Sequence, residues 1–211
     1  MNPRDRLPGT MSLLGDALRL AALLAAVVCV VIGQWDDAIR FVVVLGVLLT
    51  SRLVALPRPF DAALGSTLLL ATAAMAAGWY ASIGWIDWLI HCVTTGAVAA
   101  VAVLLLIRTA LLPPLQHPVL TSRRATVVLL VVTVGFAVGA LWEFYEWLAT
   151  NALGIAMVVG YTDTIADLAM DGLGSLLAGL ALAAWARRGR TSRRSVSAPA
   201  TGADNRGNVS P

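Results

Sequence analysis

Six long apolar stretches dominate this sequence and restrict what it can fold into. They cover approximately residues 17–34, 39–56, 60–80, 85–107, 125–149 and 163–186. A hydrocarbon core of about 30 Å needs about 20 helical residues to cross it, and a helix satisfies its own backbone hydrogen bonds inside lipid. Hydrophobic residues make up 59% of the chain and the mean hydropathy is +0.82, well above an ordinary globular chain. We therefore expect an all-α, polytopic membrane helix bundle with about six transmembrane helices over residues 1–186.

The placement of arginine predicts the orientation of this bundle. The chain contains no lysine, so arginine supplies all 15 positive charges. Most of them lie in the N-terminal segment, in the loops near residues 52–58 and 108–124, and after residue 186, whereas Arg40 is the only basic residue in the alternate loops. By the positive-inside rule both termini of this multi-pass membrane protein are cytoplasmic. Residues 187–211, rich in Ser, Arg and Gly, are expected to form a disordered basic cytoplasmic tail.

Ionisable residues inside the apolar stretches are the second unusual feature. The chain contains only two glutamates, both in the fifth stretch. Neighbours within each cluster are three or four positions apart and therefore share a helix face. In the expected topology, three clusters on three helices lie in the outer half of the membrane: Asp87 and His91; Glu143 and Glu146; Asp163, Asp167 and Asp171.

The negative charge of these acidic clusters must be balanced inside the membrane. A charge at the centre of a membrane helix costs about 2.5–3.5 kcal/mol, so residues kept at that cost are functional candidates. Arg40 is the only nearby cation in the sequence, which leaves bound metal ions or bound protons. Carboxylates with one imidazole suit Mg²⁺, Mn²⁺ or Ca²⁺ better than Zn²⁺. We expect a divalent-metal cofactor held by Glu143, Glu146, Asp163, Asp167 and Asp171, with His91 as ligand or general base and Asp87 orienting it, the last two forming the catalytic pair.

A glycine motif predicts which helix faces meet. Gly135 and Gly139 form a small-residue G-x-x-x-G motif that lets helix backbones approach closely. The same stripe continues through Glu143. We therefore expect the fifth and sixth helices to pack through their acidic faces, with Glu143 and Asp171 facing one pocket beside His91.

The segments IDWLIH, WEFYEW and YTDTIADLAMDGLG together resemble the YjdF-type family of small, multi-span bacterial inner-membrane proteins. A fainter similarity is to VanZ-like proteins, which combine D-K-x-x-H with E-x-x-Q and an Asp-x3-Asn stretch. Trp88, Glu146 and Asp171 stand here in place of that lysine, glutamine and asparagine. These resemblances imply the grouping of the seven acidic and histidine residues, but they supply no reaction.

The leading hypothesis is a metal-dependent membrane protein whose outward-facing site acts on an envelope lipid or lipid-linked headgroup. A cation or proton transporter is the first alternative, because intramembrane carboxylates also form ion paths. An accessory subunit in which the cluster only stabilises the fold is the second. The expected partners are the lipid bilayer and a lipid-type substrate, with no nucleic acid; the oligomeric state stays open.

The topology can be tested by cysteine labelling after Cys29 and Cys92 are replaced. Cysteines introduced in the loops at 34–38 and 150–160 should react from outside the cell with an impermeant maleimide. Cysteines introduced at 113–122 and 195–205 should not react. The reverse pattern would place the acidic clusters on the cytoplasmic side.

Overall fold

Seven α-helices form the regular structure of residues 10–115, 124–155 and 157–196, which are the residues that the computed structural model describes. In chain order they are α1 (Thr10–Val31), α2 (Trp35–Leu53), α3 (Arg58–Ala76), α4 (Trp79–Ser82), α5 (Ile86–Arg108), α7 (Arg124–Ala152) and α8 (Tyr161–Val196). No strand occurs within those ranges. The expected all-α class is therefore confirmed.

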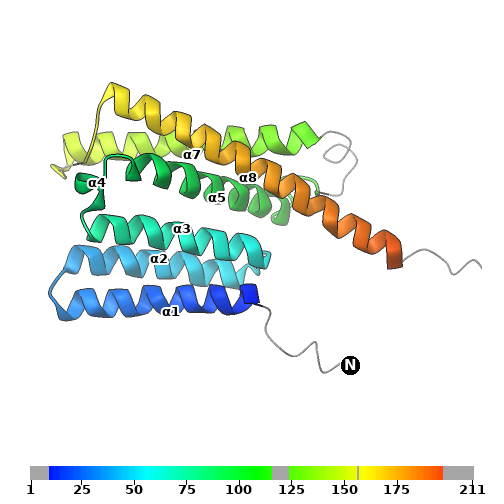
Figure 1. Ribbon diagram of the computed structural model, residues 1–211, viewed down its shortest axis with the longest axis horizontal. Coiled ribbons are helices and arrows are strands. Elements are labelled where there is room, and N and C mark those ends of the chain that lie inside the picture. Colours follow the sequence, from blue (N-terminus) through cyan, green and yellow to red (C-terminus); the bar gives the residue numbers. More distant parts are fainter. Residues whose placement is uncertain (1–9, 116–123, 156, 197–211) are drawn as a thin grey trace, which may run out of the picture.

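Five of these helices are long and apolar enough to cross a membrane. The candidate spans are Met11–Val31, Arg58–Ala76, Ile86–Arg108, Ala125–Ala152 and Tyr161–Arg187. The expected second span corresponds to α2, which falls outside this set because it carries Asp36, Asp37, Arg40 and Arg52. It is nevertheless 19 residues long and runs beside α1 and α3 (Figure 1). The protein is thus a multi-pass membrane protein with five candidate spans, and a sixth span through α2 stays a prediction.

The six long helices form two groups of three, and the short helix α4 connects the groups (Figure 1). Helices α1, α2 and α3 pack against one another, and so do α5, α7 and α8. Among the described residues, α3 joins the two groups through its contact with α5. Large apolar side chains cover the outside of the bundle; Leu129 and Leu141, for example, are 67% and 68% exposed. Such a surface suits contact with lipid.

The third predicted stretch, 60–80, is interrupted in the structure. Helix α3 ends at Ala76, and Gly78 has a φ of 68° in the left-handed region. Glycine adopts this conformation without a Cβ penalty and commonly ends a helix. The chain then forms the short helix α4, which turns it towards the start of α5. Tyr80 therefore belongs to a separate element, and the expectation of continuous helix through residue 80 was wrong.

The boundary of the expected C-terminal tail also differs. Helix α8 has 36 residues and continues through 187–196, a segment that the sequence assigned to the tail. Arginine is a good helix former, and the first proline after this segment is Pro199. Residues 197–211 lie outside the described residues, so a disordered tail there stays a prediction.

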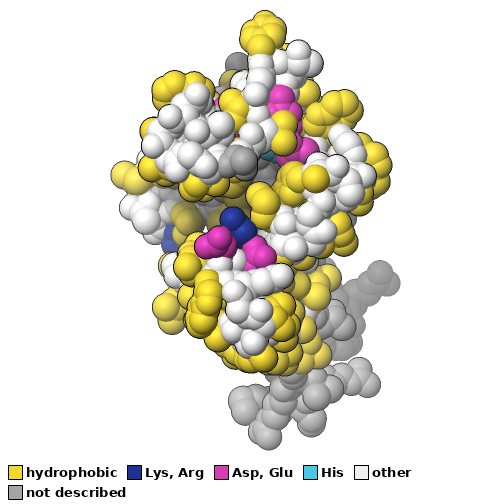
Figure 2. Space-filling view, turned by 90° about the vertical axis from the view of Figure 1, so that its left-hand side faces the viewer, with side chains coloured by type: hydrophobic (Ala, Val, Ile, Leu, Met, Phe, Trp, Pro, Cys, Tyr) yellow, Lys and Arg dark blue, Asp and Glu magenta, His cyan; other side chains and the backbone are white. Residues whose placement is uncertain are grey.

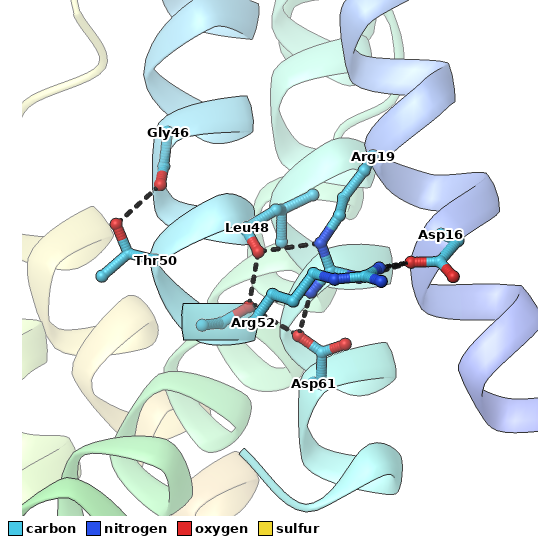
Figure 3. A network of polar contacts seen from close by, with 8 residues as sticks. Asp16, Arg19, Gly46, Leu48, Thr50, Arg52 and Asp61 are labelled. Atoms are coloured by element: carbon cyan, nitrogen blue, oxygen red, sulfur yellow. Dashed lines mark hydrogen bonds and ion pairs between the residues drawn. The ribbon is translucent and has the colours of Figure 1, made fainter. Parts of the chain in front are cut away.

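A buried ion pair ties the first three helices together (Figure 3). Arg19 on α1 is only 8% exposed and donates to the Asp61 carboxylate on α3 at 2.7 Å and to the Leu48 carbonyl on α2 at 2.9 Å. Ser51 on α2 donates to the same Asp61 oxygen at 2.5 Å. Arg19 thus lies inside α1, and Asp61 of α3 neutralises its charge.

Breaking this pair should destabilise the protein. Asp61→Ala leaves the buried Arg19 charge without its carboxylate, for which we expect a loss of about 3–5 kcal/mol. Arg52→Ala is the matched control, because Arg52 pairs with Asp16 while their side chains are 60% and 45% exposed; its cost should be about 0–1 kcal/mol. Unfolding followed in detergent measures both. Equal effects would contradict a special role for the Arg19–Asp61 pair.

Candidate functional site

Three chain segments meet at the end of the bundle that carries α4 (Figure 1). They are the start of α5, the end of α7 and the start of α8, and all three helices pack against one another. Viewed from this end, acidic side chains gather next to a histidine (Figure 2). The three helix segments that carry the acidic clusters therefore lie together, as expected from the sequence.

His91 on α5 is held by a carboxylate of α8. Its ring is 7% exposed, and its Nδ1 lies 3.1 Å from Oδ1 of Asp171. Thr95, one turn further along α5, donates its hydroxyl to the same oxygen at 2.6 Å. An ionised carboxylate only accepts hydrogen bonds, so Nδ1 donates when Asp171 is ionised. In the neutral form of His91, this tautomer leaves the lone pair on Nε2.

Two further carboxylates lie close to the His91 ring. Oδ1 of Asp87 is 3.7 Å from Nε2, too far for a hydrogen bond. Ligand atoms of Asp87, His91 and Asp167 all lie within 4.8 Å of one another. Two atoms bound to one ion are at most about 5 Å apart, twice a typical Ca–O distance. The three side chains therefore form a group of the right size to bind a single cation.

Asp167 is the most unusual member of this group. Its side chain is 0% exposed, and neither carboxylate oxygen has a hydrogen-bond partner among the described residues. A buried polar group without a partner is costly, and a buried carboxylate more so. Asp87, by contrast, has a side chain that is 24% exposed and so connects the group to the surface. The group is thus buried at Asp167 and accessible at Asp87.

The G-x-x-x-G motif makes room for the acidic side chains. A Cβ atom on Gly139 would collide with Oδ2 of Asp171, and one on Gly135 would collide with Oγ of Ser175. Asp171 and Ser175 are both 0% exposed. The glycines therefore let α7 lie directly against the polar face of α8. Close packing of these two helices through their acidic faces is confirmed at Asp171.

Of the five expected carboxylate ligands, only Asp167 belongs to the three-residue group. Asp171 lies against Nδ1 of His91 instead, and three others are not part of the group. Glu143 and Glu146 on α7 and Asp163 in the first turn of α8 are half-buried. One oxygen of Glu143 is buried without a hydrogen-bond partner among the described residues. Within the described residues, the cation-sized group contains Asp87, His91 and Asp167 alone. Ligand roles for the other three stay predictions.

Tyr80 is a neighbour that the sequence interpretation missed. Burial raises the pKa of its phenol, and the charges of Asp87, Glu146 and Asp167 raise it further. The phenol therefore keeps its proton and is a hydrogen-bond donor close to the carboxylates. The sequence signal that could have found Tyr80 is its position two residues after Gly78, where the chain turns back towards α5.

Together, the fold and the site define a multi-pass membrane helix bundle with a buried acid–histidine group at one end. Residues 16–188 match the family described as "Predicted membrane protein (DUF2238)". The chain belongs to this family. No curated protein and no solved structure matches it. The resemblances to YjdF-type and VanZ-like proteins therefore stay predictions.

Two adjacent threonines test the hydrogen bonding around His91. Thr95→Val removes the donor to Asp171, and we expect a loss of about 1–3 kcal/mol because a buried acceptor loses its partner. Thr94→Val is the matched control, since the hydroxyl of Thr94 is buried without a partner, and it should be neutral or stabilising. Unfolding in detergent compares the two variants. A greater loss in Thr94→Val would contradict the geometry described for Asp171.

Proposed function

We propose that the protein binds one divalent cation between Asp87, His91 and Asp167. The observation that carries this proposal is the fully buried Asp167 carboxylate, whose two oxygens have no partner although they lie beside two other potential ligands. A bound cation would supply the missing interaction for both oxygens. It would also offset a concentration of negative charge that the neighbouring side chains leave uncompensated.

Arg40 does not provide that compensation. The sequence made it the only candidate cation near the acidic clusters, but its guanidinium binds Asp37 on its own helix at 2.5 Å. Among the described ion pairs, His91 alone lies next to the acidic residues of α5 and α8. If Asp87, Asp167 and Asp171 are all ionised, one histidine leaves excess negative charge even when it is protonated. This balance supports a cation of charge two.

The geometry favours distinct roles for the two aspartates that flank His91. Asp171 accepts the Nδ1 proton and is itself fixed by Thr95. Metal-binding histidines commonly donate their other ring nitrogen to a carboxylate in this way. Asp87 lies on the Nε2 side, where a ligand would be. We therefore assign Asp87 as a ligand and Asp171 as the residue that orients His91, which exchanges the roles expected from the sequence.

The donor set limits the choice of metal. Carboxylates favour Mg²⁺, Ca²⁺ and Mn²⁺, whereas imidazole favours Zn²⁺ and other transition metals. Mn²⁺ and Mg²⁺ act on phosphate oxygens as Lewis acids in many enzymes. In the topology given by the arginines, the site lies at the level of the outer headgroups. We propose that it acts there on a phosphate-bearing envelope lipid or lipid-linked headgroup, with partly exposed Asp87 at the entrance.

A transport path receives less support from the structure. Below Ser175 the space between α5, α7 and α8 is filled by buried apolar side chains, among them Val103, Val131 and Leu182. An ion that reached Asp171 would meet this apolar layer before the opposite membrane surface. Carboxylate chains in transporters continue across the membrane, so we place transport second.

Measuring the metal content of the purified protein tests the proposal. Protein purified in mild detergent without chelators, equilibrated with Mn²⁺ and desalted, should retain about one ion per chain by mass spectrometry, as expected for a single three-ligand site. Asp167→Asn and Asp87→Asn should each remove the ion. Asp171→Asn should weaken binding by about 10–100-fold, as loss of an orienting partner does. Asp36→Asn, which changes an exposed acid in the first turn of α2, is the control.

Equal metal content in the wild type and Asp167→Asn would overturn the proposal. Circular dichroism and gel filtration identify variants that fail to fold. If Asp87→Asn and Asp167→Asn both unfold before metal is considered, the cluster stabilises the fold, as in the accessory-subunit alternative. Proton-driven ion flux in vesicles that Asp167→Asn abolishes would support transport instead.

A further inference from the structure

A groove between α3, α5 and α8 lies apart from the acid–histidine group. Its volume is about 420 Å³. Its walls are almost entirely apolar, with small side chains such as Ala63, Ala97 and Ala181. Every residue that lines it falls within one of three candidate spans, Arg58–Ala76, Ile86–Arg108 and Tyr161–Arg187. The groove therefore lies between helix segments that are apolar enough to be surrounded by the hydrocarbon of a bilayer.

The shape of the groove follows from how three helices pack. Helix α5 forms its floor, because α3 and α8 both pack against α5. Gly96 on α5 and Gly174 on α8 bring these two backbones close together, and a Cβ on Gly174 would collide with the carbonyl oxygen of Cys92. At the end far from α4, Phe60 of α3 meets Trp185 of α8 edge to face, with ring centroids 5.4 Å apart. The two side walls are thus joined at that end.

These dimensions restrict what can fill the groove. A transmembrane helix from another chain would need several turns, and the Phe60–Trp185 contact blocks its course between α3 and α8. Water is disfavoured because the lining offers almost no polar partners. A single hydrocarbon chain is narrow and flexible enough to follow the groove.

We propose that this groove binds one acyl chain of a membrane phospholipid. The binding is dispersive and hydrophobic, since no charged side chain lines the groove. The acyl chain contacts the apolar side chains of α3 and α8 that face the groove, along the floor formed by α5. The proposal is independent of metal binding, because none of the lining residues belongs to the acid–histidine group.

Photo-cross-linking tests the groove directly. The full-length protein is placed in phosphatidylethanolamine vesicles that contain a phospholipid with a diazirine in its acyl chain, and adducts are mapped by mass spectrometry. We expect adducts concentrated on the lining residues of α3, α5 and α8. Ala63→Trp and Ala181→Trp, both at exposed lining positions, should lower them roughly tenfold, equivalent to excluding about two methylene groups. Ala137→Trp, at an exposed position on α7, is the matched control and should change nothing.

Three results would overturn the proposal. Adducts spread evenly over all exposed helix faces would show that only bulk lipid was labelled. Groove adducts unchanged by both Ala63→Trp and Ala181→Trp would show that the chain lies elsewhere. Cross-links within the groove to a second copy of the protein would show a protein occupant. Metal content measured on the same samples should stay at the wild-type value, which separates this test from that of the metal site.

Discussion

The direct contact between α7 and α8 is the interaction on which the site depends. Gly135 and Gly139 remove the Cβ atoms that would strike Ser175 and Asp171, and the two helices can therefore enclose a carboxylate completely. Asp171 then lies within reach of His91 and Thr95 on α5. One helical turn earlier, the same face of α8 places Asp167 beside His91 and Asp87. A larger residue at either glycine would separate the helices and open this arrangement to lipid.

The two ends of the bundle solve the problem of buried charge in opposite ways. At the end far from α4, Arg19 and Asp61 neutralise each other, and Ser51 and the Leu48 carbonyl complete their hydrogen bonds. At the α4 end, carboxylates outnumber the single histidine, and both oxygens of Asp167 lack partners among the described residues. All polar groups around Arg19 and Asp61 have partners, so that network can stabilise the fold without a ligand. The acid–histidine group lacks such partners at Asp167 in the described part of the chain, and we therefore infer a cation there and none beside Arg19.

Much of this could be predicted from the sequence, because hydrophobic length and helical period are local properties. They gave the helical class, the position of α5, and the shared faces of Asp87 with His91 and of Asp167 with Asp171. Three features depended on contacts between distant segments and were missed. The role of Arg19 depends on Asp61 of α3 lying beside it. The position of Tyr80 near the acidic residues depends on the packing of α4 against α5. The roles of Asp87 and Asp171 follow from which ring nitrogen each one faces, and that depends on the rotation of α5 against α8.

Pulsed electron paramagnetic resonance of the Mn²⁺-loaded protein tests the central claim most directly, because it detects a nitrogen nucleus bonded to the metal. If His91 binds through Nε2 as the geometry indicates, the spectrum should show coupling to one imidazole nitrogen. His91→Ala should abolish this coupling, whereas Asp36→Asn should leave it unchanged. A bound Mn²⁺ without nitrogen coupling, or coupling that survives His91→Ala, would contradict a metal centre formed by Asp87, His91 and Asp167.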